Sequence, residues 1–364
     1  TGDILIESLN TAYIDSTVTA LSIGVAASAK GSGLAVSGSG ALGFNTILSK
    51  TVAFISNSSV TGQNISITAD SQSNIIARVL AMAVSVALSG KDKATGVAIG
   101  ASFARNLIGW DTWTQEADYT NEDTGVFLIQ GDTVQITDGP LMGNTYEFTD
   151  LFMQDSDLST MNYGDRSIWK QTNLRGAVGE VLAYIFNSSI NAMGDLMLAA
   201  LATQTIDAII LAASVAIAGS SKDATSISVG GVYAENRIYE HVKAYVDGDG
   251  PTGINAESVK LTANDHSGIS AIAGSASIAG AFSGQGSGTA VSVGLTIAIN
   301  EISNTVEAYI ADVSNDLEAR SGDVTITALS QGMPVFDVDF AGLGFTAADL
   351  DDAAKEDIDD PDTA

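Results

Sequence analysis

Long stretches of the chain alternate between bulky aliphatic and small residues with a period of two. From Val291 to Ile299, large aliphatic side chains occupy the odd positions and Ala, Ser, Gly or Thr the even ones, which predicts a β-strand. Stretches 75–88 and 269–281 are small or apolar on both faces, which predicts strands covered on both sides. Ala-rich helix is the alternative for these stretches. Because they are dense in Gly, Ser and β-branched residues and lack helix caps, we favour strands.

The strands belong to a repeat, because a short motif returns four times. It reads Asn, any residue, Ile, and it begins at Asn45, Asn106, Asn236 and Asn300. An aromatic residue preceded by Ala follows nine residues later in three copies, as Phe54, Tyr245 and Tyr309. In the second copy the equivalent Tyr184 comes 78 residues after Asn106, which predicts an insertion of 69 residues (78 minus 9).

The copies also begin alike, with a turn followed by an alternating strand. These starts lie at Gly2, Gly62, Gly194, Glu257 and Gly322. Their spacings are 60, 132, 63 and 65 residues, and removing the 69-residue insertion turns 132 into 63. The predicted units are 1–61, 62–193 with an inserted module at 109–177, 194–256, 257–321, the start of a fifth repeat at 322–336, and an acidic tail or truncated next insertion at 337–364.

A polar, glycine-bearing segment lies near the middle of each full copy and predicts a turn. These segments are 30–33, 89–93, 219–223 and 283–288. Each copy then reads as strand, long strand, turn, long strand, short strand. The predicted fold is all-β: a parallel β-solenoid of four repeats of about 60–65 residues and the start of a fifth, with one inserted small β-module.

In such a stack, equivalent side chains lie about 4.8 Å apart. Four asparagines (Asn45, Asn106, Asn236, Asn300) are therefore expected to form an amide ladder, and four aromatics (Phe54, Tyr184, Tyr245, Tyr309) to stack. We interpret both sets as structural rather than ligand-binding.

Composition narrows the possible partners. The 364 residues are 45% hydrophobic and carry 43 acidic against 15 basic side chains, a net charge of -28. Such a surface repels nucleic acid and anionic membranes. No apolar run has the length of a membrane-spanning segment, and the absence of cysteine excludes thiolate metal sites and cysteine nucleophiles. Because the sequence begins inside a repeat, we expect it to be part of a longer chain.

The insertion differs in composition from the repeats. It holds all three tryptophans, Trp110, Trp113 and Trp169, and its centre has the pattern of short strands joined by tight turns. The order Gly131, Val134, Tyr146, Trp169-Lys170 resembles small chitin- and cellulose-type carbohydrate-binding modules, although the spacing differs. Trp110, Trp113, Tyr146 and Trp169 are accordingly either the core of a small module or a platform for sugar rings.

The repeat motif is clearest from Ala290 to Ile310 and resembles the repeats of giant bacterial surface proteins, the large adhesin and filamentous leukotoxin-like group. The resemblance implies a secreted or cell-surface structural and adhesive segment that forms an elongated stalk or filament. Its expected partners are further copies joined end to end, neighbouring repeats and cell-surface glycans. Carbohydrate binding by the insertion is the alternative function, and a β-helix polysaccharide lyase or hydrolase is a further one.

No catalytic residues are predicted. His241 and His266 are the only histidines, lie in different copies and have no neighbours spaced as in a catalytic triad. No cofactor is expected apart from a possible calcium ion, for which Asp247 and Asp249 in a glycine-rich turn are the candidate ligands. A solvated turn is the alternative interpretation of these two aspartates.

Overall fold

The computed structural model describes residues 2–109, 117–138, 141–165, 167–172 and 178–332. Their regular structure is almost entirely β-strand, and the one helical segment in these ranges is the 3-10 turn η1, Leu158–Thr160. The all-β prediction is confirmed. No helix in the described ranges is long and apolar enough to cross a membrane.

Four parallel sheets build the repeat body. Sheet A comprises β1 Ile4–Asn10, β6 Ile65–Ser71, β16 Leu196–Ala202, β20 Val259–Asp265 and β25 Val324–Ser330. Sheet B comprises β2 Tyr13–Ser28, β7 Asn74–Ser89, β17 Thr205–Ser220 and β21 Gly268–Ser283. Sheet C comprises β3 Gly33–Ile47, β8 Ala94–Ile108, β18 Ala224–Ile238 and β22 Gly288–Ile302. Sheet D comprises β4 Lys50–Ser56, β5 Ser59–Gly62, β15 Gly179–Ala192, β19 Glu240–Ala256, β23 Thr305–Ala311 and β24 Leu317–Ala319.

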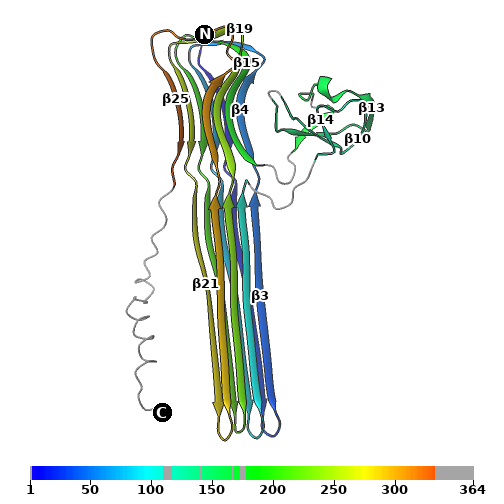
Figure 1. Cartoon of the computed structure of the whole chain (residues 1–364), viewed down its shortest axis with the longest axis vertical. Coiled ribbons are helices and arrows are strands. Elements are labelled where there is room, and N and C mark those ends of the chain that lie inside the picture. The colour runs from blue at the N-terminus through cyan, green and yellow to red at the C-terminus, as the bar shows by residue number, and fades with distance from the viewer. Residues whose placement is uncertain (1, 110–116, 139–140, 166, 173–177, 333–364) are drawn as a thin grey trace. The chain divides into compact units, whose positions relative to one another are not determined.

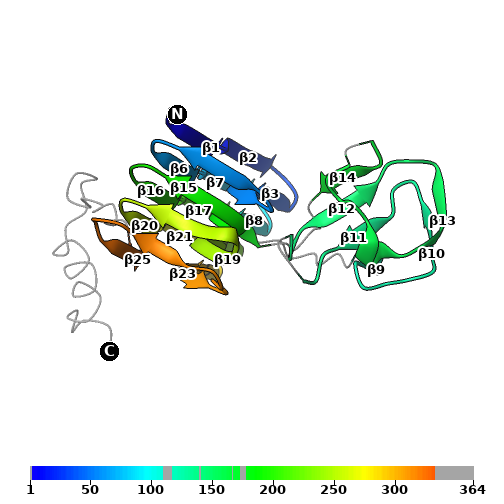
Figure 2. The same cartoon turned by 90° about the horizontal axis from the view of Figure 1, so that it is seen from above.

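Each coil of the chain passes through the four sheets in the order A, B, C, D. The chain reverses between B and C, so strands A and B form one layer and strands C and D the other. Figure 1 shows strands of successive coils side by side and the long strands ending in a row of turns. Seen from above, the coils follow one another in chain order from β1 to β25 (Figure 2). The short strand, two long strands and intervening turn of each copy follow one another as predicted, but the last strand is longer than expected in two copies, with 14 residues in β15 and 17 in β19.

Sheets A and D enclose a core of bulky aliphatic side chains. Ile67 on β6, Leu198 on β16 and Leu261 on β20 are fully buried there and pack with Ile185 and Val246 of sheet D. Burying a side chain of this size stabilises the fold by about 1.5–3 kcal/mol. This half of each coil therefore has the ordinary arrangement of a large apolar interior.

Sheets B and C are different, because towards the turns only small residues lie between them. Ala83, Ala98 and Ala216 form one buried cluster there. The two layers are so close that a Cβ built on Gly100 would lie 2.6 Å from the carbonyl oxygen of Ala213 in the opposite sheet. The Ser85 hydroxyl also donates across the layers, to the carbonyl of Ala35 at 2.8 Å.

In this part of the long strands the bulky side chains point outward instead. On β2, Leu21, Ile23 and Val25 are 63, 64 and 70% exposed, and on β3 Leu34 and Val36 are 64 and 61% exposed. The prediction that strands such as 75–88 and 269–281 are covered on both sides is therefore wrong for the described chain. One face packs against the opposite layer, and no other described element covers the second face.

The inserted module enters between β8 and β15, at the passage from sheet C to sheet D in the second coil. Its strands are β9 Tyr119–Thr120, β10 Val126–Ile129, β11 Thr133–Gln135, β12 Thr145–Phe148, β13 Phe152–Ser156 and β14 Trp169–Thr172. A four-stranded sheet has the order β14-β12-β11-β9, and β10 pairs with β13 in a second, two-stranded sheet. The small β-module expected from the turn pattern is present.

Candidate functional site: the ladders and the inserted module

The four repeated asparagines meet inside the stack of sheet C. Asn45 Nδ2 donates to Asn106 Oδ1 at 2.8 Å, and Asn106 Nδ2 donates to Asn236 Oδ1 at 2.7 Å. Asn236 Nδ2 then donates to Asn300 Oδ1 at 2.8 Å. Because Asn106 and Asn236 are fully buried, each amide depends on the next coil for a partner that water cannot supply.

The aromatic residues of the repeat stack on sheet D. The ring centroids of Phe54 and Tyr184 are 5.1 Å apart, those of Tyr184 and Tyr245 4.9 Å, and those of Tyr245 and Tyr309 5.0 Å. The rings are within 11° of parallel in each pair. Burial raises the pKa of Tyr184 and of Tyr245 above the ordinary value, so both phenols stay neutral. The two inner rings, Tyr184 and Tyr245, therefore present both faces to neighbouring rings rather than to a ligand.

Two of the predicted sugar-platform residues belong to the module's core. Trp169 is 2% exposed and Tyr146 6% exposed, and both pack with Phe148 and Tyr163. Tyr163 and Trp169 have ring centroids 5.0 Å apart, and burial raises the pKa of Tyr163 to about 12. A stacking platform needs an exposed ring face, so the structure does not support sugar binding by Tyr146 or Trp169. Trp110 and Trp113 lie outside the described residues.

Among the described residues of the module, the exposed aromatics are two phenylalanines that were not among the predicted site residues. Phe127 on β10 is 52% exposed and Phe152 on β13 63% exposed, and their ring centroids are 6.1 Å apart. Ile129 and Leu151, 50 and 74% exposed, lie beside them in sequence. The signal was available as the alternation of β10, where Val126 and Leu128 point into the core and Phe127 and Ile129 point out.

The two candidate calcium ligands already have protein partners. The Asp249 carboxylate accepts hydrogen bonds from the backbone N–H groups of Ser314 and Asn315, both at 2.8 Å. Desolvation opposes ionisation of Asp249, but these donors outweigh it and lower its pKa to about 2. Burial, followed by the charge of Asp312 and a hydrogen bond with it, raises the pKa of Asp247. Both aspartates therefore join the turn of one coil to that of the next.

In the described residues, no group of three or more His, Asp or Glu side chains is arranged to hold a metal ion. His241 contacts Tyr239 edge to face, and burial, then the charge of Lys243, lowers its pKa. His266 Nε2 lies 2.9 Å from Gln331 Oε1 in the next coil. The two histidines remain in different coils and have no shared partner among these contacts.

A buried polar seam crosses the interior where sheet A meets sheet B. It consists of Asn10, Ser71, Ser73, Gln204, Glu240, Asp265, Ser267 and Asn304. Gln204 Nε2 donates to both Ser71 and Glu240, and Glu240 is fully buried. Burial raises the pKa of Glu240 to about 7; the hydrogen bond from Gln204 lowers it and the charge of Asp265 raises it. Because the seam is buried, its carboxylates are out of reach of a polysaccharide.

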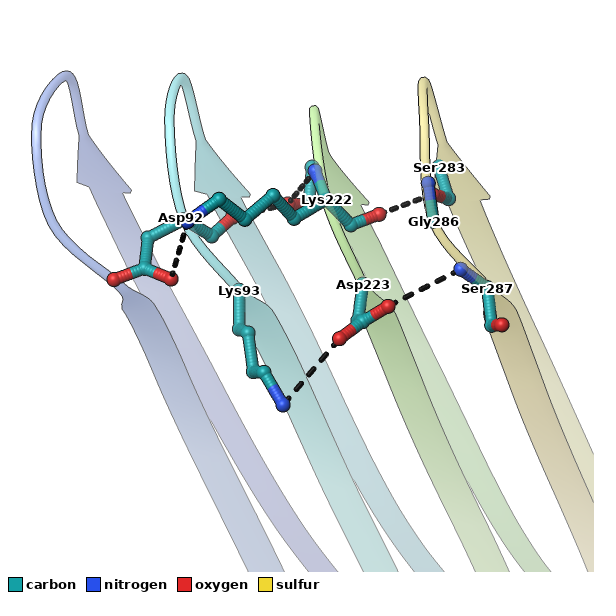
Figure 3. A network of polar contacts seen from close by, with 8 residues as sticks. Asp92, Lys93, Lys222, Asp223, Ser283, Gly286 and Ser287 are labelled. Atoms are coloured by element: carbon teal, nitrogen blue, oxygen red, sulfur yellow. Dashed lines mark hydrogen bonds and ion pairs between the residues drawn. The ribbon is translucent and has the colours of Figure 1, made fainter.

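Reciprocal ion pairs join two neighbouring turns between sheets B and C, those of the second and third coils (Figure 3). Lys93 Nζ lies 3.3 Å from Asp223, and Lys222 Nζ lies 3.7 Å from Asp92. Asp223 also accepts from the backbone N–H of Ser287 in the following coil at 3.2 Å. That hydrogen bond, followed by the contact with Lys93, lowers the pKa of Asp223. Exposed pairs of this kind contribute little stability, but they align the turns.

No protein-family model, curated protein or solved structure matches the chain.

Proposed function

We propose that the chain is a structural and adhesive segment of a large secreted or cell-surface bacterial protein, built to extend by stacking coils into a stalk or filament. The amide ladder is the observation that carries the proposal. Residues that recur with the repeat, Asn106 and Asn236 above all, serve contacts between one coil and the next. The side-chain amides of these residues join each coil to the next one in the stack.

Strand spacing supports end-to-end growth as part of this function. Each coil adds only about 4.8 Å along the stack, so a long stalk requires many coils, from a longer chain or from further copies. The first coil exposes the free edges of β1, β2 and β3, and the described chain ends in β25, which pairs only with β20. Unpaired strand edges of this kind accept another strand.

A disulfide test follows from the register of sheet A. Glu7 aligns with Thr68, Ala199, Thr262 and Thr327 in successive coils. If a second copy continues the stack in register, Thr327 of one copy lies beside Glu7 of the next. Because the chain has no cysteine, the double variant Glu7→Cys/Thr327→Cys should form a ladder of covalent oligomers on mild oxidation.

The matched control is Glu7→Cys/Thr325→Cys, whose second cysteine lies on the same face two residues out of register. The diagonal separation of about 7–8 Å between such positions exceeds the reach of a disulfide. Ordered end-to-end stacking would be contradicted if the in-register variant gave nothing but monomers at high protein concentration. It would also be contradicted if both variants cross-linked to the same extent.

Carbohydrate binding by the module is a second candidate, centred on Phe127 and Phe152, because these are the exposed aromatic rings among its described residues. A glycan-array screen followed by calorimetry tests it. Phe127→Ala and Phe152→Ala should each abolish binding, whereas Met142→Ala, at a 67% exposed position elsewhere in the module, should not. Absence of any bound glycan for the intact chain would remove this candidate.

A further inference from the structure

The outer faces of sheets B and C carry a continuous apolar band. We define the band as the outward-facing residues of 19–27, 80–88, 211–219 and 274–282 on sheet B, and of 34–42, 95–103, 225–233 and 289–297 on sheet C. None of these eight nine-residue stretches contains a charged residue. The exposure extends to the last coil, where Ile278 is 62% and Phe282 68% exposed.

Charged residues limit the band at both ends. On sheet B, Asp15 and Arg78 form an ion pair of 2.7 Å just before the band begins. Lys30 and the lysines and aspartates of the second and third turns follow it. On sheet C, the Arg105–Glu235 ion pair of 2.8 Å marks the same boundary. The band is therefore a defined surface rather than a general lack of polar residues.

The size of the band is that of a protein interface. Four strands about 4.8 Å apart and nine residues long at about 3.3 Å each give roughly 600 Å² in projection on each face. Soluble monomers rarely expose contiguous apolar patches above a few hundred Å². A standard interface buries about 800 Å² per partner, so one face approaches that value and the two faces together exceed it.

We infer that the apolar band is a lateral docking surface on which a second copy of this chain packs, sheet face against sheet face. Flat β-sheets pack in this way about 10 Å apart. Rows that mix large and small residues, such as Ala27, Leu88, Gly219 and Phe282, provide projections and hollows that interdigitate. Since both faces carry a band, a copy docked on one face leaves the other free, and lateral assembly continues into layers.

The hydrocarbon interior of a lipid bilayer fits this surface less well than a second copy of the chain does. The outermost long strands of the described chain, β2 and β3 in the first coil and β21 and β22 in the last, each have one edge without a strand partner. In a lipid interior, their backbone N–H and C=O groups would be unsatisfied, at several kcal/mol each. In a stack of copies, the same edges remain in water or pair with a further coil.

Lateral docking is independent of the end-to-end stacking proposed above, because it uses faces and not strand edges. Its test introduces one charge per face at outward positions, Val215→Lys on sheet B and Val229→Lys on sheet C. These side chains point away from the interior, so circular dichroism and the urea midpoint should match the parent chain. Ser270→Lys, on the same face of sheet B but outside the band, is the matched control.

Sedimentation velocity and negative-stain microscopy give the readout. The parent chain and Ser270→Lys should form side-by-side assemblies that widen with concentration. Each single band variant should stop at two copies abreast, joined through the face that it leaves unaltered. The double variant should show particles only one copy wide, whether single or joined end to end.

Three results would overturn the inference. The parent chain could remain one copy wide at every concentration, the double variant could associate as the parent does, or Ser270→Lys could disrupt pairing as strongly as the band variants. Cosedimentation of the parent chain with phosphatidylcholine vesicles, without self-association in their absence, would assign the band to lipid and reject the second copy as its occupant.

Discussion

Bulky and small side chains alternate along the strands in both halves of each coil, but the bulky ones face inward in one half and outward in the other. Between sheets A and D, residues such as Ile67 and Leu198 face inward and are fully buried. Between sheets B and C, Ala, Ser and Gly face inward near the turns, and Leu21, Ile23 and Val25 face water. Hydrophobicity alone therefore does not decide which face of a strand is the inside; the closeness of the opposing layer does.

The largest expected difference between the halves comes from removing a buried leucine. Leu198→Ala leaves a cavity between sheets A and D and should lower the free energy of unfolding by about 2–5 kcal/mol. Leu211→Ala makes the same change on the outward face of β17, where the side chain is 39% exposed, and should cost much less. Urea unfolding of both variants at a concentration where the chain is monomeric measures the difference. Equal losses would contradict the inverted arrangement.

Glu240 offers a pH-dependent comparison at the polar seam between the halves. Its pKa is about 7 in the folded chain against an ordinary 4.5. Between these values the folded state binds more protons than the unfolded state. The contribution of Glu240 is therefore fully present below about pH 4.5 and is lost as the pH rises through 7, a change of roughly 3 kcal/mol.

Glu240→Gln removes this titration while keeping the shape of the side chain. Urea unfolding at pH 5 and pH 8 should show the parent chain losing more stability with rising pH than the variant does. The large negative charge of the rest of the protein affects both chains almost equally, so the difference isolates Glu240. Parallel pH profiles would show that the buried carboxyl keeps an ordinary pKa.

Much of the fold was predictable because the chain repeats. Turn segments such as 219–223 and the motif at Asn236 fixed the order and alignment of the strands, and the displaced Tyr184 located the insertion. The inward face was not predictable, since period-two alternation shows that two faces differ but not which one meets another layer. The burial of Trp169 could not be predicted either, because an aromatic residue in a short strand is equally compatible with a small core and with a sugar-binding platform.

A smaller effect should follow from adding a single carbon between the close layers. Gly100→Ala places its Cβ 2.6 Å from the Ala213 carbonyl oxygen, so the backbones must separate, at about 1–3 kcal/mol. Gly231→Ala is the matched control, because a Cβ on Gly231 meets nothing within 4 Å. That variant should be neutral or stabilising by up to about 1 kcal/mol. Thermal melting of both variants shows whether the small interior is required, and a tolerated Gly100→Ala would argue that the layers can move apart.

The smallest expected effect compares two valines on the same strand, β7. Val79 points inward and is 1% exposed, whereas Val86 points outward within the apolar band. Val79→Thr buries a hydroxyl among aliphatic side chains and should cost about 1–3 kcal/mol, while Val86→Thr should change the free energy of unfolding by less than about 0.5 kcal/mol. Because the substitution and the strand are the same, intrinsic strand preference cancels between the two variants. Urea unfolding of dilute, monomeric protein measures both, and a cost at Val86 as large as at Val79 would mean that the outer face of sheet B is covered in the folded chain itself.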